Sequence, residues 1–65
     1  QYTFTIQSEN ATLFELFNIL GEKVKEVNIT NTQTKIQRDE LANGLYFYIL
    51  SNKHNKIDSG KIIFE

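Results

Sequence analysis

Few side chains in this chain of 65 residues could carry out catalysis. The single histidine, His54, lies among polar residues in a predicted hairpin loop, where a solvated side chain is the ordinary outcome. Asp39 and Glu40 are adjacent carboxylates, but acidic residues at this place favour the N-terminus of a helical turn. No serine or threonine has a base at a spacing that indicates an activated nucleophile. We therefore predict no catalytic residues and no enzymatic activity.

Metal, cofactor and nucleic-acid sites have equally little support in the sequence. The absence of cysteine excludes a disulfide framework and a zinc knuckle. A calcium site needs clustered oxygen ligands, and only Asp39, Glu40 and Asp58 are candidates. The formal net charge of -1 argues against a nucleic-acid partner. No segment approaches the roughly 18 apolar residues of a membrane span. We expect no metal, no cofactor, no nucleic acid and no membrane insertion.

The elements that must position any functional side chain are strands. Apolar residues recur with a period of two, and helical spacing is not sustained for three turns anywhere. The predicted strands cover residues 2–6, 13–17, 23–29, 34–37, 45–51 and 56–65. Short polar turns between them favour an antiparallel sandwich over βαβ units. We predict one all-β domain over residues 1–65, an immunoglobulin-like antiparallel β-sandwich of about six or seven short strands. Because proline is absent, lysines such as Lys23, Lys25 and Lys35 are expected to protect the edge strands.

The most informative spacing is Leu41-x-x-Gly44-x-Tyr46. In immunoglobulin-like sandwiches, a tyrosine early in the penultimate strand bonds through its hydroxyl to the backbone a few residues upstream and fixes the crossover between the sheets. Tyr46 fits this role, and Gly44 would adopt a positive φ just before the strand. Asp39 would cap a single helical turn leading into it. A two-residue hairpin on Asn43-Gly44 is the alternative.

Two further patterns frame this one. Phe14 and Leu16 share one face of a predicted strand, which a tight turn through Asn18 and Gly21 connects to a returning strand. Residues 59–65 predict a final, strongly apolar strand with a β-bulge at Gly60.

In this order and at these distances, the three patterns resemble the type A C-terminal sorting domain of proteins exported by the type IX secretion system of Bacteroidota. "LFNILGEKV" is similar to the first signature of that family, "LANGLYFYIL" to the second and "SGKIIFE" to the terminal one. The resemblance covers roughly residues 13–65. The glycine and tyrosine of the family's second signature correspond to Gly44 and Tyr46. The glycine and lysine of its terminal signature correspond to Gly60 and Lys61.

The resemblance also implies a function and partners. It implies a non-catalytic signal at the carboxyl end of a longer protein, from which this segment was excised. Outer-membrane translocon or shuttle proteins of the type IX machinery would recognise the domain after passage through the periplasm. A sortase-like signal peptidase would usually remove it, leaving the product secreted or at the cell surface. The preceding cargo domain is a further expected neighbour.

Residues 45–50 are apolar on both faces of the predicted strand, which needs an explanation. If Tyr46, Tyr48 and Leu50 face the core, Leu45, Phe47 and Ile49 point outward and Ile63 extends their row. An outward apolar patch of this kind usually marks a contact surface. The alternative is that loops and long side chains cover both faces. The expected recognition residues are Gly44, Tyr46, Phe47, Ile49, Gly60, Lys61 and Ile63, and the expected structural residues are Phe14, Leu16, Asn18, Gly21 and Leu41.

Lys61 is the first candidate for the recognised element. An ammonium beside apolar side chains on an edge strand offers both a charge and backbone pairing to a partner. An ordinary solvated edge lysine is the alternative. The competing function for the whole domain is an immunoglobulin-like or fibronectin-like accessory module that binds carbohydrate or acts as a spacer, and a groove of exposed aromatic residues would favour carbohydrate binding.

Overall fold

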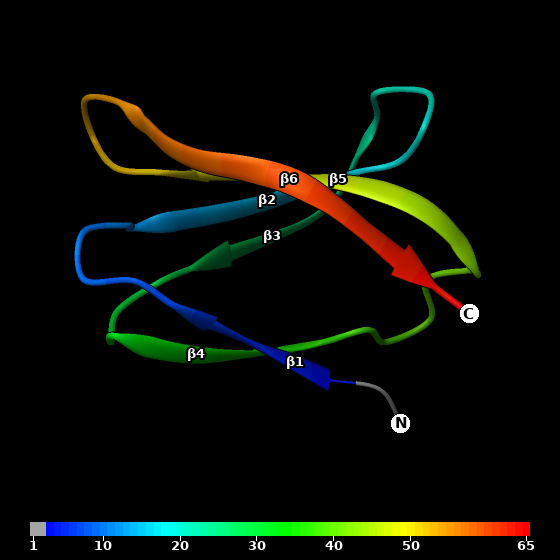
Figure 1. Ribbon diagram of the computed structural model, residues 1–65, viewed down its shortest axis with the longest axis horizontal. Helices are drawn as coiled ribbons and strands as arrows, with labels where there is room; N and C mark the ends of the chain where they lie inside the picture. Colours follow the sequence, from blue (N-terminus) through cyan, green and yellow to red (C-terminus); the bar gives the residue numbers. More distant parts are fainter. Residues whose placement is uncertain (1–2) are drawn as a thin grey trace.

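The computed structural model describes residues 3–65, and these residues form six β-strands in two antiparallel sheets (Figure 1). The smaller sheet pairs β1 (Thr3–Gln7) with β4 (Gln33–Gln37). The larger has the order β3-β2-β5-β6, made of β2 (Leu13–Phe17), β3 (Lys23–Asn28), β5 (Gly44–Ser51) and β6 (Lys56–Phe64). No helix occurs within residues 3–65. The predicted all-β, immunoglobulin-like sandwich is confirmed.

The strand boundaries agree with those predicted to within one residue at each end. The predicted start of the first strand at Tyr2 lies outside the described residues. The chain changes sheet between β1 and β2, between β3 and β4, and between β4 and β5, whereas β2–β3 and β5–β6 are hairpins within the larger sheet. Figure 1 shows the two layers, with β1 and β4 lying below the four-stranded sheet.

The core lies between the two layers and is built by alternation along each strand. Phe14 and Leu16 of β2 are completely buried, and the ring of Phe14 contacts Phe4 edge-on at 6.0 Å and stacks on Tyr48 at 6.1 Å between centroids. Burying a side chain of this size contributes about 1.5–3 kcal/mol. The buried apolar residues are Ile6, Ala11, Phe14, Leu16, Ile29, Ile36, Tyr46, Leu50 and Phe64.

The crossover from β4 to β5 is the predicted tyrosine corner. The Tyr46 hydroxyl donates a hydrogen bond of 2.8 Å to the carbonyl of Ala42, and Gly44 has a φ of 143°. The alternative hairpin on Asn43-Gly44 is wrong, because β4 and β5 lie in different sheets.

The helical turn predicted to start at Asp39 is also wrong. Asp39 has a φ of 58°, the left-handed region, and a residue that caps the N-terminus of a helix has an extended backbone instead. Its carboxylate accepts a hydrogen bond from the ammonium of Lys25 on β3. An ion pair between the crossover turn and β3 therefore takes the place of the cap that the local sequence suggested.

The bulge predicted at Gly60 lies elsewhere. Gly60 pairs with Tyr48 in an uninterrupted ladder, and the register shifts between the pairs Leu50–Asp58 and Ser51–Lys56, which places the extra residue at Ile57. A Cβ atom at Gly60 would lie 2.8–3.0 Å from the Tyr48 ring. The glycine therefore makes room for an aromatic ring and does not bend the strand.

Removing the corner hydroxyl gives a direct test of the crossover. We expect Tyr46→Phe to lower the free energy of unfolding by about 0.5–1.5 kcal/mol, because the carbonyl of Ala42 loses its donor. This corresponds to a fall in Tm of roughly 4–8 °C per kcal/mol for a domain of this size. Tyr48→Phe is the matched control, since its hydroxyl makes no hydrogen bond within residues 3–65, and equal melting of both variants would contradict the corner.

Candidate recognition surface

The outer face of the four-stranded sheet carries a row of apolar side chains. Along β5, Tyr46 and Leu50 face the core and are buried, with only 7% and 6% of their surface exposed. On the opposite side, Phe47 is 40% exposed, and Ile63 on β6 is 61% exposed. We call this row, which consists of Leu45, Phe47, Ile49 and Ile63, the outer apolar row. Leu45 lies directly opposite Ile63 across the β5–β6 ladder. Further along β5, Phe47 is exposed and Ile49 is half-buried.

Two lysines border the outer apolar row. Lys61 pairs with Phe47 across the β5–β6 ladder and is exposed on the same face. Lys56 lies further along β6, and both lysines line a shallow hollow of about 490 Å³ whose floor includes Phe47 and Ile49. Neither ammonium forms an ion pair with any residue of the described chain. This half of the face is therefore apolar with an uncompensated positive charge.

On the β2–β3 half of the same face, charged side chains form ion pairs with one another. The ammonium of Lys23 bonds to the carboxylates of Glu26 and, at 3.3 Å, Glu15. These hydrogen bonds hold the pKa of Lys23 above its usual value, because they favour the charged ammonium. Exposed pairs of this kind add little stability. Their effect is to leave the β5–β6 half as the part of the face with positive charge available to a partner.

The β2–β3 turn presents two further apolar side chains. The side-chain oxygen of Asn18 accepts hydrogen bonds from the backbone amides of Leu20 and Glu22 at 2.9 and 3.0 Å, and Gly21 has a φ of 85°. Ile19 and Leu20 at the tip are 69% and 78% exposed. Sequence reasoning assigned the turn but not this exposure, although two aliphatic residues inside a four-residue turn were the available signal.

The structure separates the expected recognition residues into two groups. Phe47, Ile49, Lys61 and Ile63 share the outer face, although Ile49 is half-buried. The other three have internal roles: Tyr46 is buried, and its ring lies 5.1 Å from that of Phe64. Gly44 lies at the crossover and Gly60 lies against the Tyr48 ring.

The crossover also contains a residue that sequence reasoning missed. The guanidinium of Arg38 donates to the carbonyl of Leu41 at 2.9 Å and to the side chain of Asn43. It also lies 4.8 Å from the centre of the Phe64 ring, within cation–π range. Arg38 thereby joins the crossover to the end of β6. No local pattern indicated this, because its partners are set by the packing of the two sheets.

The residues considered for chemistry do not come together. His54 is exposed in the β5–β6 loop, Asp39 and Glu40 lie in the crossover turn, and Asp58 lies on β6. Within residues 3–65, no three histidine or acidic side chains are grouped so that they could hold a metal ion. The same residues include no helix able to span a membrane.

The fold and this surface define a class: a small immunoglobulin-like sandwich whose most distinctive surface feature is an exposed apolar and basic sheet face. The chain belongs to the family of secretion system C-terminal sorting domains, whose model matches residues 1–65. No individual curated protein and no solved structure matches the chain significantly. Membership in this family identifies the chain as a sorting signal of the type IX secretion system. Such a signal interacts with that machinery and directs export to the cell surface or the extracellular space. Domains of this family are generally non-catalytic.

Proposed function

We propose that this domain is a non-catalytic folded address at the end of a longer protein, and that the type IX machinery reads its surface. The observation that carries the proposal is the outer apolar row beside two unpaired lysines on a sheet face. Contiguous exposed apolar side chains on a small soluble domain usually serve a contact. A carbohydrate-binding role has less support, because Phe47 is the single aromatic among the strongly exposed large apolar residues of the described chain.

The chemistry of the surface specifies the partner. An outer-membrane shuttle or translocon protein would present an apolar patch to Phe47 and Ile63 and at least one carboxylate to Lys61 or Lys56. Complementary charge at the rim of such a contact accelerates association and fixes orientation. A sortase-like signal peptidase would act after this recognition step and separate the domain from its cargo. Neither step requires a catalytic group in the domain itself.

The proposal is tested by fusing residues 1–65, with the natural residues that precede them, to a periplasmic reporter with a signal peptide in a bacterium that has a type IX system. We expect the reporter on the cell surface or in the medium. The control is the same fusion in a strain whose translocon is inactive, where the reporter should remain in the periplasm. Periplasmic retention in the competent strain, with the domain folded, would reject the address.

Substitutions on the outer apolar row test which surface is read. We expect Phe47→Ser and Ile63→Ser to leave the fold intact, because both side chains are at least 40% exposed. A central apolar residue of an interface typically contributes about 2 kcal/mol, so each substitution should weaken binding to the partner roughly 30-fold. Sorting of the reporter and affinity for the isolated partner are the measurements.

Ile57→Ser provides the matched control, since Ile57 is 39% exposed on β6, the strand of Ile63, but lies outside the outer apolar row. Equal sorting by all three variants would mean that another surface is recognised.

Lys61→Glu should reduce the association rate more strongly at low than at high ionic strength, because salt screens a charge at the rim.

A further inference from the structure

The crossover that connects β4 to β5 (Figure 1) contains an asparagine that is followed by glycine. Asn43 and Gly44 are both exposed, and a Cβ atom at Gly44 would meet no atom within 4 Å beyond its chain neighbours. Because glycine has no side chain, its backbone nitrogen can approach the side-chain amide of the preceding asparagine without obstruction. Asn43 is therefore the asparagine of this chain whose side chain is most open to attack by the backbone.

A positive charge is held at the side-chain carbonyl of Asn43. The Nη2 atom of Arg38 donates a hydrogen bond to Oδ1 of Asn43. Two contacts fix the guanidinium there: Nε donates to the carbonyl of Leu41 at 2.9 Å, and the centre of the Phe64 ring lies 4.8 Å away. A donor that is already in place at an oxygen lowers the barrier of a reaction in which that oxygen gains negative charge. Arg38 is thus placed to stabilise an oxyanion at Asn43.

The other asparagines lack this combination. The side-chain oxygens of Asn18 and Asn52 each accept hydrogen bonds from two backbone amides, which are neutral donors. The residues that follow them are Ile19 and Lys53, whose side chains hinder the approach of the backbone nitrogen. Arg38 is the only arginine in the chain, so no other asparagine can have a guanidinium at its oxygen.

We propose that Asn43 reacts spontaneously with the backbone of Gly44, and that Arg38 accelerates this reaction. The amide nitrogen of Gly44 gives its proton to water and forms a bond to Cγ of Asn43, while the carbonyl electron pair moves to Oδ1. The oxyanion then collapses, the Cγ–Nδ2 bond breaks, and Nδ2 takes up a proton and leaves as ammonia. Water opens the resulting cyclic imide at either of its two carbonyls, which produces aspartate or isoaspartate. Water is the only co-reactant.

The two products have opposite effects on the crossover. Aspartate keeps the length of the backbone and places a carboxylate beside Arg38, and a charge-assisted hydrogen bond is stronger than a neutral one. Isoaspartate adds one carbon atom to the backbone between Ala42 and Gly44. The hydrogen bond of 2.8 Å from the Tyr46 hydroxyl to the carbonyl of Ala42 spans this same segment. Isoaspartate should therefore displace that carbonyl and weaken the tyrosine corner.

The weakened corner has a consequence for sorting. If the type IX machinery reads a folded surface, formation of isoaspartate limits the time during which a protein that has not been exported can still be sorted. This consequence rests on the proposed function, whereas the reaction at Asn43 does not.

The site is tested by ageing the purified protein at mildly alkaline pH and measuring deamidation at each asparagine. Digestion at acidic pH stops the reaction, and mass spectrometry of the peptides measures its extent. We expect Asn43 to react at least about tenfold faster than any other asparagine, which corresponds to a barrier lower by about 1.4 kcal/mol. Asn43→Gln is the control, because its longer side chain would have to form a larger ring. Equal rates at Asn43 and the other asparagines would overturn the inference.

The role of Arg38 is tested by substitution and by unfolding. Arg38→Gln, with folding verified by circular dichroism, should slow the reaction at Asn43 several-fold, and Arg38→Lys should retain part of the rate because it keeps a charge. In urea the crossover is not formed, so the wild-type protein should react more slowly there than in its folded state. An unchanged or faster reaction in folded Arg38→Gln would overturn the role of Arg38. So would a slower reaction of the wild-type protein when it is folded, a comparison that needs no variant.

The products are compared by thermal melting. Asn43→Asp reproduces the aspartate product and should melt at or above the temperature of the wild-type protein. The isoaspartate form, separated from the aged protein by chromatography, should melt below it. Equal melting of the isoaspartate form and the wild-type protein would overturn the proposed effect on the corner. Sorting is not a readout in any of these experiments, so a failure of the folded address and a failure of this inference are distinguishable.

Discussion

Phe14→Ala is expected to remove a large share of the stability of the domain, about 3–5 kcal/mol, and to raise its unfolded fraction. Phe14 is completely buried, and it contacts both Phe4 of the smaller sheet and Tyr48 of the larger. Truncating a buried phenylalanine costs about 3–5 kcal/mol, because the transfer energy is lost and a cavity remains. A domain of this length has a total stability of roughly 3–10 kcal/mol. The midpoint of urea unfolding, followed by circular dichroism, measures the effect.

The same substitution separates a folded address from a linear one. Phe14→Ala leaves every exposed side chain of the domain unchanged, including the outer apolar row. If the machinery reads a surface, sorting of a fused reporter should fall in proportion to the folded fraction. If it reads a peptide, sorting should persist in the unfolded variant. Phe14→Leu, which refills most of the volume, should retain both the fold and most of the sorting.

Gly60→Ala is expected to have the second largest effect, for a reason that involves no ligand. The added methyl group would lie 2.8–3.0 Å from the Tyr48 ring, which cannot simply move away because it also stacks on Phe14. Overpacking of this kind costs about 1–3 kcal/mol. Ser59→Ala, at the exposed neighbouring position, is the matched control and should be nearly neutral. Chemical denaturation of both variants gives the difference in unfolding free energy.

A double-mutant cycle identifies the cause. Tyr48→Ala destabilises the domain by removing a half-buried ring, but it also removes the obstacle to a methyl group at position 60. The double variant should therefore be more stable than the sum of the two single effects predicts, by about 1–3 kcal/mol. Strict additivity would mean that the Tyr48 ring is not what requires a glycine. Sorting that is lost without any loss of stability would return Gly60 to the recognition surface.

Features that depend on neighbouring residues were predictable from the sequence. The period of two identified the strands because burial on one side of a sheet is a local property of each strand. Asn18 and Gly21 marked the turn correctly, since its hydrogen bonds connect residues at most four positions apart. Leu41-x-x-Gly44-x-Tyr46 identified the corner for the same reason, as the hydroxyl of Tyr46 reaches only to Ala42.

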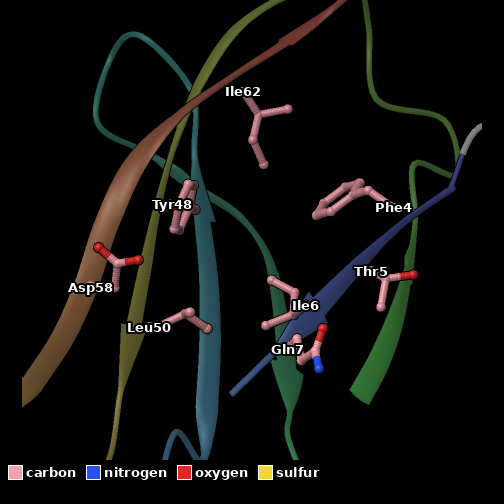
Figure 2. Close-up of a pocket in the computed structure, with 8 residues that line it drawn as sticks. All are labelled: Phe4, Thr5, Ile6, Gln7, Tyr48, Leu50, Asp58 and Ile62. Carbon is pink, nitrogen blue, oxygen red and sulfur yellow. The ribbon is translucent and has the colours of Figure 1, made fainter. Parts of the chain in front are cut away.

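Tertiary structure alone decided the features that depend on register and on how one sheet lies over the other. Asp39 of the crossover turn pairs with Lys25 of β3, the bulge falls at Ile57, and Gly60 accommodates a ring from the neighbouring strand. The groove between β1 and β6, lined by residues such as Phe4 and Ile62 (Figure 2), likewise follows from the different widths of the two sheets. These widths depend on pairing between strands that are far apart in the chain, such as β1 with β4. Sequence spacing specifies which side of its own strand a residue occupies. It does not specify which residue of another strand will lie opposite, because that is set by the packing of the whole core.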